Sequence, residues 1–250
     1  MSTFGENYSR YYNLLYKDKD YNGEVDYITE IVKRYGKPET KELLDIGCGT
    51  GKHLKLFRDK GFSIAGVDLS ESMITEAKLY LDQADNLYCG RASEFSLNKK
   101  FDVIVSIFHV MSYQTENSEI QKVFENVYNH LNDGGLFIFD FWYGPAVLTD
   151  PPVVKIKRLE DDAIRVTRIT EPVMHANTNT IDVNFEVLIE DKGSGKIQVV
   201  KEMHEMRYLF LPEIKEYISD SGLKFIDAFE WMSSEKLSFK SWYGVVVIKR

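Results

Sequence analysis

The chain has little of what several classes of protein require. Its 250 residues include two cysteines, too few for a disulfide framework or a cysteine-rich zinc site. Its five histidines are scattered without the spacing of metal ligands, so we expect no bound metal. The formal net charge of −8 argues against sequence-independent nucleic-acid binding, which needs clustered lysine and arginine. We therefore expect no nucleic-acid partner.

Long hydrophobic runs are also missing. No stretch approaches the length of a membrane span, and the first ten residues lack the basic and apolar regions of a signal peptide. Apolar residues at 44% and charged residues at 28% are ordinary for a globular protein. We expect a cytoplasmic protein with no membrane partner.

The most informative stretch lies between residues 43 and 51. Residues 43–46 are strand-like, and glycines follow at positions 47, 49 and 51. An amphipathic segment comes next, and a second apolar run over 62–67 ends on Asp68. This order is typical of a nucleoside-binding α/β unit, because glycines let the backbone approach a ligand and a terminal acid can bind ribose hydroxyls. The following helix N-terminus presents N–H groups to an anion.

The glycine spacing separates two kinds of nucleoside site. A dinucleotide fingerprint would need glycine where Lys52 stands. The observed G-x-G-x-G, preceded by Asp45, resembles the first motif of class I S-adenosylmethionine-dependent methyltransferases, and residues 67–73 resemble the second. The resemblance implies S-adenosyl-L-methionine as donor and S-adenosyl-L-homocysteine as product. An NAD-dependent oxidoreductase and a non-catalytic donor-binding domain remain less favoured alternatives.

Alternating strand and helix patterns predict the fold class. We expect an α/β protein with a Rossmann-like, doubly wound, mostly parallel seven-stranded sheet. Between its fifth and sixth strands the pattern changes to apolar-polar alternation, which predicts an antiparallel β insertion. The expected divisions are a helical cap at 1–36, a donor-binding core at 37–150 and 212–250, and the insertion at 151–211.

The methyltransferase resemblance also implies which residues bind the donor. The glycine loop would hold its methionine moiety, Asp68 its ribose, and Leu69 and Met73 its adenine. The family usually has an acid after the third strand, but Arg91 stands there, so its side chain or the backbone of Arg91 and Ala92 would contact the adenine. The expected cofactor-binding residues are Tyr12, Tyr16, Asp45, Gly47, Cys48, Gly49, Gly51, His53, Asp68, Leu69, Met73, Arg91, Ala92 and Phe108.

Candidates for the acceptor side follow the fourth and fifth strands. Ligands bind at the carboxyl ends of strands in open α/β sheets, which makes His109 and Tyr113 catalytic candidates. A histidine there could accept a proton from an ammonium or hydroxyl group. Trp142 and Tyr143 lie just beyond the fifth strand, where aromatic faces could attract a cationic sulfonium or amine.

The whole chain resembles one branch of the superfamily, the bacterial N,N-dimethyltransferases of nucleotide-linked amino sugars. The matching segments are 12–16, 49–54 and 141–143 with the following Pro145. The resemblance implies that Tyr12 and Tyr16 close over the donor and that the insertion forms part of the acceptor site or a dimer contact. Arg168 and His175 are then candidates to bind an acidic or phosphorylated small-molecule substrate. O-methylation of another metabolite is the alternative reaction, and a monomer and a homodimer both remain open.

Overall fold

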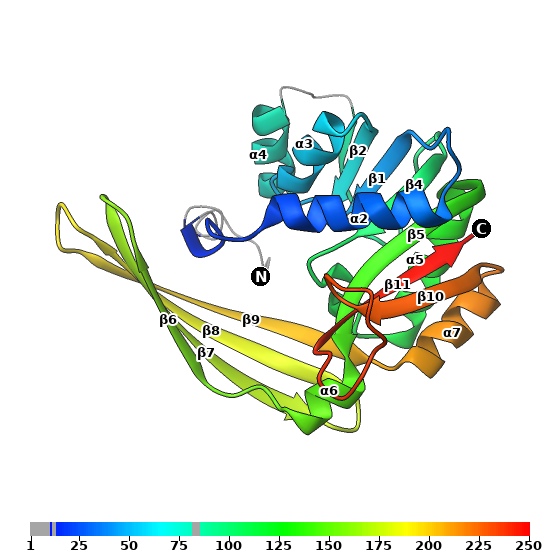
Figure 1. Cartoon of the computed structure of the whole chain (residues 1–250). Coiled ribbons are helices and arrows are strands. Elements are labelled where there is room, and N and C mark those ends of the chain that lie inside the picture. The colour runs from blue at the N-terminus through cyan, green and yellow to red at the C-terminus, as the bar shows by residue number, and fades with distance from the viewer. Residues whose placement is uncertain (1–10, 12–13, 82–85) are drawn as a thin grey trace.

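The computed structural model describes residues 11, 14–81 and 86–250 (Figure 1). Its core is a seven-stranded sheet in the order β3-β2-β1-β4-β5-β11-β10, in which β11 runs antiparallel to both of its neighbours. This arrangement confirms the predicted doubly wound, mostly parallel sheet. The strands are β1 (Glu42–Ile46), β2 (Ser63–Asp68), β3 (Leu87–Cys89), β4 (Phe101–Ser106), β5 (Leu131–Tyr143), β10 (Lys224–Glu230) and β11 (Tyr243–Lys249).

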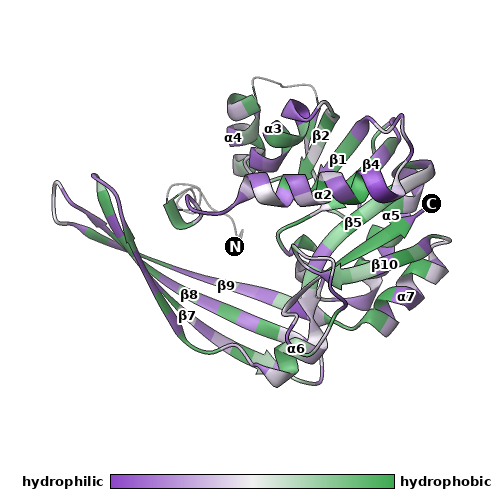
Figure 2. Ribbon diagram, in the orientation of Figure 1, coloured by the Kyte–Doolittle hydropathy of each residue, from purple (hydrophilic) through white to green (hydrophobic). Residues whose placement is uncertain are grey.

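Helices cover both faces of this sheet. One apolar cluster joins one face of the sheet to the helices over residues 21–35, 52–59 and 71–81. Another cluster joins the opposite face to the helices over 117–130 and 211–220. Figure 2 shows the matching pattern, with hydrophobic colour concentrated on the core strands. The helices are α2 (Tyr21–Tyr35), α3 (Lys52–Asp59), α4 (Glu71–Leu81), the 3-10 helix η1 (Val110–Tyr113), α5 (Asn117–His130), α6 (Gly144–Thr149) and α7 (Leu211–Asp220). None of the helices described is long and apolar enough to cross a membrane.

The antiparallel insertion is confirmed between the fifth and sixth strands of the core sheet. It contains β6 (Lys155–Glu160), β7 (Ile164–His175), β8 (Thr180–Asp191) and β9 (Ile197–Leu209), and it extends away from the core (Figure 1). The end of β9 pairs in parallel with the end of β5, through Trp142 with Tyr208 and Tyr143 with Leu209. The insertion is therefore continuous with the core sheet at the edge where ligands are expected.

The N-terminal segment, defined here as residues 11 and 14–20, packs against the insertion. The side chains of Tyr11, Leu14 and Leu15 share an apolar cluster with strands β7 and β8 and with Met73 of α4. The Lys157 ammonium on β6 donates a hydrogen bond to the Leu15 carbonyl oxygen at 2.9 Å. This segment therefore contacts both the insertion and helix α4 of the core.

Three elements have weak signals in the sequence. Helix α6 is short, and its residues 144–149 begin with Gly-Pro. Strand β6 has four charged residues among its six. Strand β5 begins at Leu131 and includes the sequence Asp133-Gly134-Gly135, with Gly134 at a positive φ of 75°.

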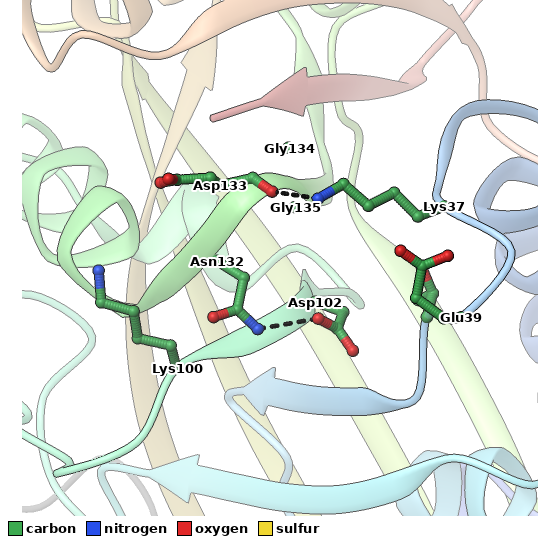
Figure 3. Close-up of a pocket in the computed structure, with 9 residues that line it drawn as sticks. Lys37, Glu39, Lys100, Asp102, Asn132, Asp133, Gly134 and Gly135 are labelled. Carbon is green, nitrogen blue, oxygen red and sulfur yellow. Dashed lines mark hydrogen bonds between the residues drawn. The ribbon is translucent and has the colours of Figure 1, made fainter.

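A polar hollow of about 410 Å³ lies where the parallel strands begin (Figure 3). The Asp102 carboxylate there accepts hydrogen bonds from the backbone N–H groups of Lys41 and Glu42 and from the Asn132 amide. The Lys37 ammonium donates to the carbonyl oxygen of Asp133. These bonds fasten the starts of β1, β4 and β5 together, which gives the hollow a structural role.

Candidate active site

A cavity of about 1010 Å³ opens at the carboxyl ends of β1, β2, β4 and β5. The inner face of the insertion and Tyr16 of the N-terminal segment form its opposite wall. The predicted site residues that line it are Tyr16, Gly47, Gly49, Asp68, Leu69, Met73, Arg91, Ala92, Phe108, His109, Tyr113, Trp142 and Arg168.

The glycine loop between β1 and α3 has a backbone that other residues would strain. Gly47 adopts a φ of +81°, and a Cβ there would lie 2.3 Å from a methyl carbon of Val110. Gly49 has a φ of +53°, but no atom lies within 4 Å of the position its Cβ would take. The loop is fixed to β2, because the N–H groups of Gly47 and Cys48 both donate to the Val67 carbonyl. It therefore presents bare backbone to the cavity at Gly49.

Asp68 is held by the backbone on both sides. Its Oδ2 accepts a hydrogen bond from the Gly49 N–H and its Oδ1 from the Ser70 N–H, each at 2.8 Å. Burial nevertheless raises the pKa of this carboxyl above its ordinary value, against the effect of the two backbone bonds. Each oxygen keeps a further lone pair, so the group can also accept hydrogen bonds from ligand hydroxyls.

Asp45 lies at 1% exposure just before the loop, and neither of its carboxylate oxygens has a hydrogen-bond partner in the described part of the chain. Burial, aided by the charge of Asp68 and opposed by that of Lys19, raises the pKa of Asp45 to about 8. Buried polar groups are rarely left without partners. An unmatched acid here, beside open space at Gly49, fits a donor whose amino-acid tail carries an ammonium group.

His53 does not line the cavity, although the motif predicted a donor contact. Its Nε2 lies 2.7 Å from a Glu24 carboxylate oxygen on α2, and the same carboxylate pairs with the Lys19 ammonium. That ammonium lies 4.4 Å from the centre of the Phe108 ring. The sequence did not predict Lys19 or Glu24 as site residues. Together they place an ion-paired ammonium beside the Phe108 ring, which lines the cavity.

Five other predicted residues lie outside the cavity lining, the buried Asp45 among them, and Tyr12 lies outside the described residues. Cys48 is buried beneath the loop against Gly66, while Gly51 caps α3. The Tyr143 ring packs edge-on against the Phe141 ring, and His175 pairs with Asp182 at the end of β7. These positions give Tyr143 and His175 structural contacts away from the cavity.

The end of the cavity beside β4 contains an unusual stretch of backbone. Phe108 and His109 have φ values of 70° and 66°, in the left-handed region that is costly for residues other than glycine. The Asp140 carboxylate holds the turn, because its Oδ1 accepts the His109 backbone N–H at 2.9 Å and its Oδ2 lies 2.6 Å from the His109 Nδ1. The imidazole also stacks on the Tyr243 ring at 4.6 Å. Neither Asp140 nor Tyr243 was expected from the sequence.

Aromatic rings surround the same end of the cavity. Tyr16 packs edge-on against Phe108 at 5.1 Å, and Trp142 against Trp242 at 5.4 Å. The Trp142 indole N–H is buried without a hydrogen-bond partner among the described residues. Such a wall can attract a cationic group to its ring faces and donate one hydrogen bond to a ligand oxygen.

The insertion contributes positive charge to the cavity. Lys155, Lys157 and Arg168 line it from β6 and β7. The Arg168 guanidinium lies over the Phe185 ring at 4.9 Å, and its Nε is buried with no hydrogen-bond partner in the part of the chain that is described. This unmatched donor points to an anionic ligand group on the insertion side.

The site combines a glycine loop with an acid at the end of the next strand, in a doubly wound sheet. This combination is the one expected of a class I S-adenosylmethionine-dependent methyltransferase. A family model described as a methyltransferase domain matches residues 43–135. The chain is also 31% identical over 215 residues to dTDP-3-amino-3,4,6-trideoxy-alpha-D-glucopyranose N,N-dimethyltransferase of Streptomyces venezuelae, covering 85% of this chain and 88% of that enzyme. The chain therefore belongs to the S-adenosylmethionine-dependent methyltransferases.

Two further similarities extend along the chain. A second relative, dTDP-4-amino-2,3,4,6-tetradeoxy-D-glucose N,N-dimethyltransferase of Saccharopolyspora spinosa, is 26% identical over 83% of this chain and 81% of its own length. The solved structure of Streptomyces venezuelae DesVI superposes with a TM-score of 0.81 at 26% identity, covering 96% of this chain and 97% of that one. These findings confirm the expected donor, S-adenosyl-L-methionine, and the expected fold.

Proposed function

We propose that this methyltransferase methylates the amino nitrogen of a nucleotide-linked amino sugar. The observation that carries the proposal is the buried, unmatched Nε of Arg168, which shares one cavity with the glycine loop. A diphosphate bound at Arg168 and Lys155 would leave the attached sugar between the insertion and the core strands. The names of the two relatives specify dTDP-linked amino sugars, which agrees with this distribution of charge.

The donor would occupy the core half of the cavity. We assign its ribose to Asp68, its amino-acid tail to the backbone of Gly47 and Gly49, and its ammonium to the neighbourhood of Asp45. Leu69 and Met73 line the cavity beside Asp68 and would contact the adenine. When bound, S-adenosyl-L-methionine supplies a sulfonium methyl group, which an acceptor lone pair takes as the sulfur–carbon bond breaks, leaving S-adenosyl-L-homocysteine.

The acceptor nitrogen would lie between the two catalytic candidates, His109 and Tyr113. The chain's contribution here is to align the nitrogen, exclude water and keep its lone pair free of a proton. His109 is fixed by Asp140 and Tyr243, so its ring can orient the sugar. Trp142 and Phe108 provide aromatic surface around the same position.

We also propose roles for the expected divisions of the chain. The insertion at 151–211 would supply the acceptor wall, and the cap at 1–36 would cover the donor through Tyr16 and the segment around it. A cytoplasmic location is proposed because Cys48 and Cys89 are both free, and an exposed free thiol such as that of Cys89 suits a reducing compartment.

Methyl-labelled donor and three acceptors test the proposal: a dTDP-linked amino sugar, the matching dTDP-linked sugar with a hydroxyl group, and the free amino sugar. We expect methylation of nitrogen in the first and at least tenfold lower efficiency with the third, the scale of one lost charged contact. Arg168→Gln should remove that preference, whereas Arg165→Gln, which changes a surface ion pair with Glu160 and Glu190, should keep it. Methylation of the hydroxyl sugar alone would contradict the proposal.

A further inference from the structure

Four polar side chains form a continuous chain between the core and the insertion beside the acceptor end of the cavity. The Tyr113 hydroxyl on η1 lies 2.8 Å from the Nδ1 of His204 on β9. The Nε2 of His204 faces a Glu202 carboxylate oxygen at 3.4 Å. The other oxygen of Glu202 accepts a hydrogen bond from the Tyr11 hydroxyl at 2.9 Å.

Tyr11 and His204 are buried, Tyr113 and Glu202 are half-buried, and the chain reaches the cavity. His204 is only 2% exposed, while both His204 and Tyr113 line the cavity. In the register of the inserted sheet, His204 pairs with Val183 and Glu202 with Phe185, which places both on the face that carries Arg168. A buried ionisable network costs free energy that apolar packing would avoid, so its position beside the acceptor calls for a chemical explanation.

We propose that Tyr113, His204 and Glu202 form a proton relay that takes the proton released from the acceptor nitrogen. Tyr113 is the catalytic residue of this relay, because it would touch the acceptor. His204, Glu202 and Tyr11 are positioning residues that act through it. The inference rests on the proposed function in one respect, since it requires an acceptor that carries a proton on nitrogen.

The relay moves one proton without changing any oxidation state. The nitrogen–hydrogen bond of the acceptor breaks, and its proton goes to the Tyr113 oxygen. The original phenolic proton moves at the same time to the His204 Nδ1. The product is an imidazolium beside the Glu202 carboxylate, and Tyr113 remains a neutral phenol throughout.

The burial of the Tyr113 hydroxyl explains why it would pass a proton to His204 and would not act as a base by itself. Burial is the main cause that holds the pKa of Tyr113 well above the ordinary value of a phenol, with smaller contributions from Tyr16, Glu202 and Asp68. A free tyrosinate is therefore strongly disfavoured. Passing its proton to His204 avoids that state.

The groups that face His204 determine which of its ring nitrogens carries the hydrogen in the neutral form. Glu202 pairs with it from β9, Tyr113 faces it from η1, and the Phe185 ring packs edge-on against it from β8 at 5.1 Å. Arg168 of β7 lies beyond that ring, as do Lys155 and Lys157 of β6 on the same face. In the neutral imidazole, a hydrogen on Nε2 facing Glu202 leaves Nδ1 free to accept from Tyr113.

Tyr11 connects the relay to the donor-covering segment. Burial and the neighbouring Glu202 charge raise the pKa of Tyr11 above its ordinary range, so it remains a hydrogen-bond donor to Glu202. The same segment carries Tyr16, which lines the cavity. Docking of the N-terminal segment would thus complete the relay as it covers the donor.

A first test needs no acceptor. Nitrogen-15 NMR of the full-length protein, with the His204 signal assigned by its loss in His204→Asn, reports which ring nitrogen carries the proton in the neutral form. We expect neutral His204 to carry its hydrogen on Nε2. In Tyr113→Phe the chemical shift of the His204 Nδ1 should change, because the hydrogen bond from the Tyr113 hydroxyl is lost. The Nδ1–H form, or an unchanged Nδ1 signal in that variant, would overturn the relay geometry whatever the substrate proves to be.

A second test measures the pH profile of kcat/KM with the amino-sugar acceptor. Tyr113→Phe and Glu202→Gln should lose about 100-fold near pH 7 and recover toward wild type at about pH 9.5, where the amine has already lost its proton in solution. Affinity for S-adenosyl-L-homocysteine should not change. Glu186→Gln, which alters a surface ion pair with Lys201 on the same sheet, serves as control.

The outcomes separate the two proposals. A loss of equal size at every pH, or no loss, would overturn the relay while leaving the proposed reaction in place. If the wild-type protein methylates no amine, the proposed function is overturned instead. The NMR measurement would still test the hydrogen bonds of His204.

Discussion

Asp140 contacts both the backbone and the side chain of His109. One carboxylate oxygen accepts the His109 N–H at 2.9 Å and the other lies 2.6 Å from Nδ1, while Asp140 itself is buried. The contact fixes two consecutive left-handed residues, Phe108 and His109, at the carboxyl end of β4. The buried acid therefore determines where the cavity presents the imidazole.

Asp140→Asn should reduce turnover by about 100-fold, because a displacement of the His109 ring of about 1 Å misaligns the acceptor. Donor affinity should remain near that of wild type, since Asp68 and the glycine loop are untouched. Asp133→Asn, at a highly exposed acid, is the control. Steady-state kinetics and donor titration calorimetry give both quantities.

His109→Ala should give the same separation of turnover from donor affinity. Since His109 and Asp140 act as one unit, the double variant should be little worse than either single variant. Additive losses in kcat would show that the two residues act independently and would contradict the positioning role of Asp140.

Asp68→Ala should weaken donor binding by about 1–3 kcal/mol, the scale for losing hydrogen bonds to a charged group. Asp59→Ala removes an exposed acid at the end of α3 and should leave affinity unchanged. Isothermal titration with S-adenosyl-L-homocysteine measures both. Equal affinities for Asp68→Ala and wild type would remove Asp68 from the donor site.

Gly49→Ala and Gly61→Ala form a matched pair. Both glycines have positive φ, and neither has an atom within 4 Å of the position that a Cβ would take. Each substitution should lower the free energy of unfolding by about 1 kcal/mol through backbone strain. Only Gly49→Ala should also weaken donor binding, because its methyl group would point into donor space; equal binding by the two variants would contradict that placement.

The raised pKa of Asp45 predicts a pH-dependent stability. The folded protein holds this proton up to about pH 8, whereas the unfolded chain releases it near the ordinary value of 3.8. Stability from this group is therefore complete below about pH 4 and is lost as pH rises toward 8. Asp45→Asn should remove that slope, with an advantage over wild type on the order of a few kcal/mol above pH 8.

Urea unfolding of ligand-free protein at several pH values measures the difference between the Asp45→Asn and wild-type curves. Donor affinity supplies the second readout, because an asparagine cannot lose a proton to form a carboxylate beside the donor ammonium. Parallel unfolding curves would show that Asp45 is already ionised in the folded protein at neutral pH.

The arrangement of the glycine loop and Asp68 could be predicted because its signals are local in sequence. Strand, glycine turn, helix and acid fall between Leu43 and Asp68, and their order alone determines that the loop and the acid meet. His53 is the exception within this motif. Helix α3 turns that side chain toward Glu24 of α2, a packing partner that the motif does not contain.

The cavity wall that contains His109, Tyr113 and His204 depends on contacts between distant segments. Asp140 meets His109 across 31 residues, and His204 meets Tyr113 across 91. Such pairs depend on the strand order and on the direction in which the insertion leaves the core. The apolar-polar alternation in β9 predicts a strand. It does not indicate which histidine of the insertion lines the cavity, and the structure shows that it is His204 rather than His175.

We propose that the bend at Gly47–Gly51 and the carboxylate of Asp68 bind the donor. A crystal structure of the protein with S-adenosyl-L-homocysteine would test this placement. We expect ribose hydroxyls hydrogen-bonded to Asp68 and the amino-acid tail against the backbone of Gly49. Density for the ligand elsewhere, or an empty cavity at saturating ligand, would contradict it.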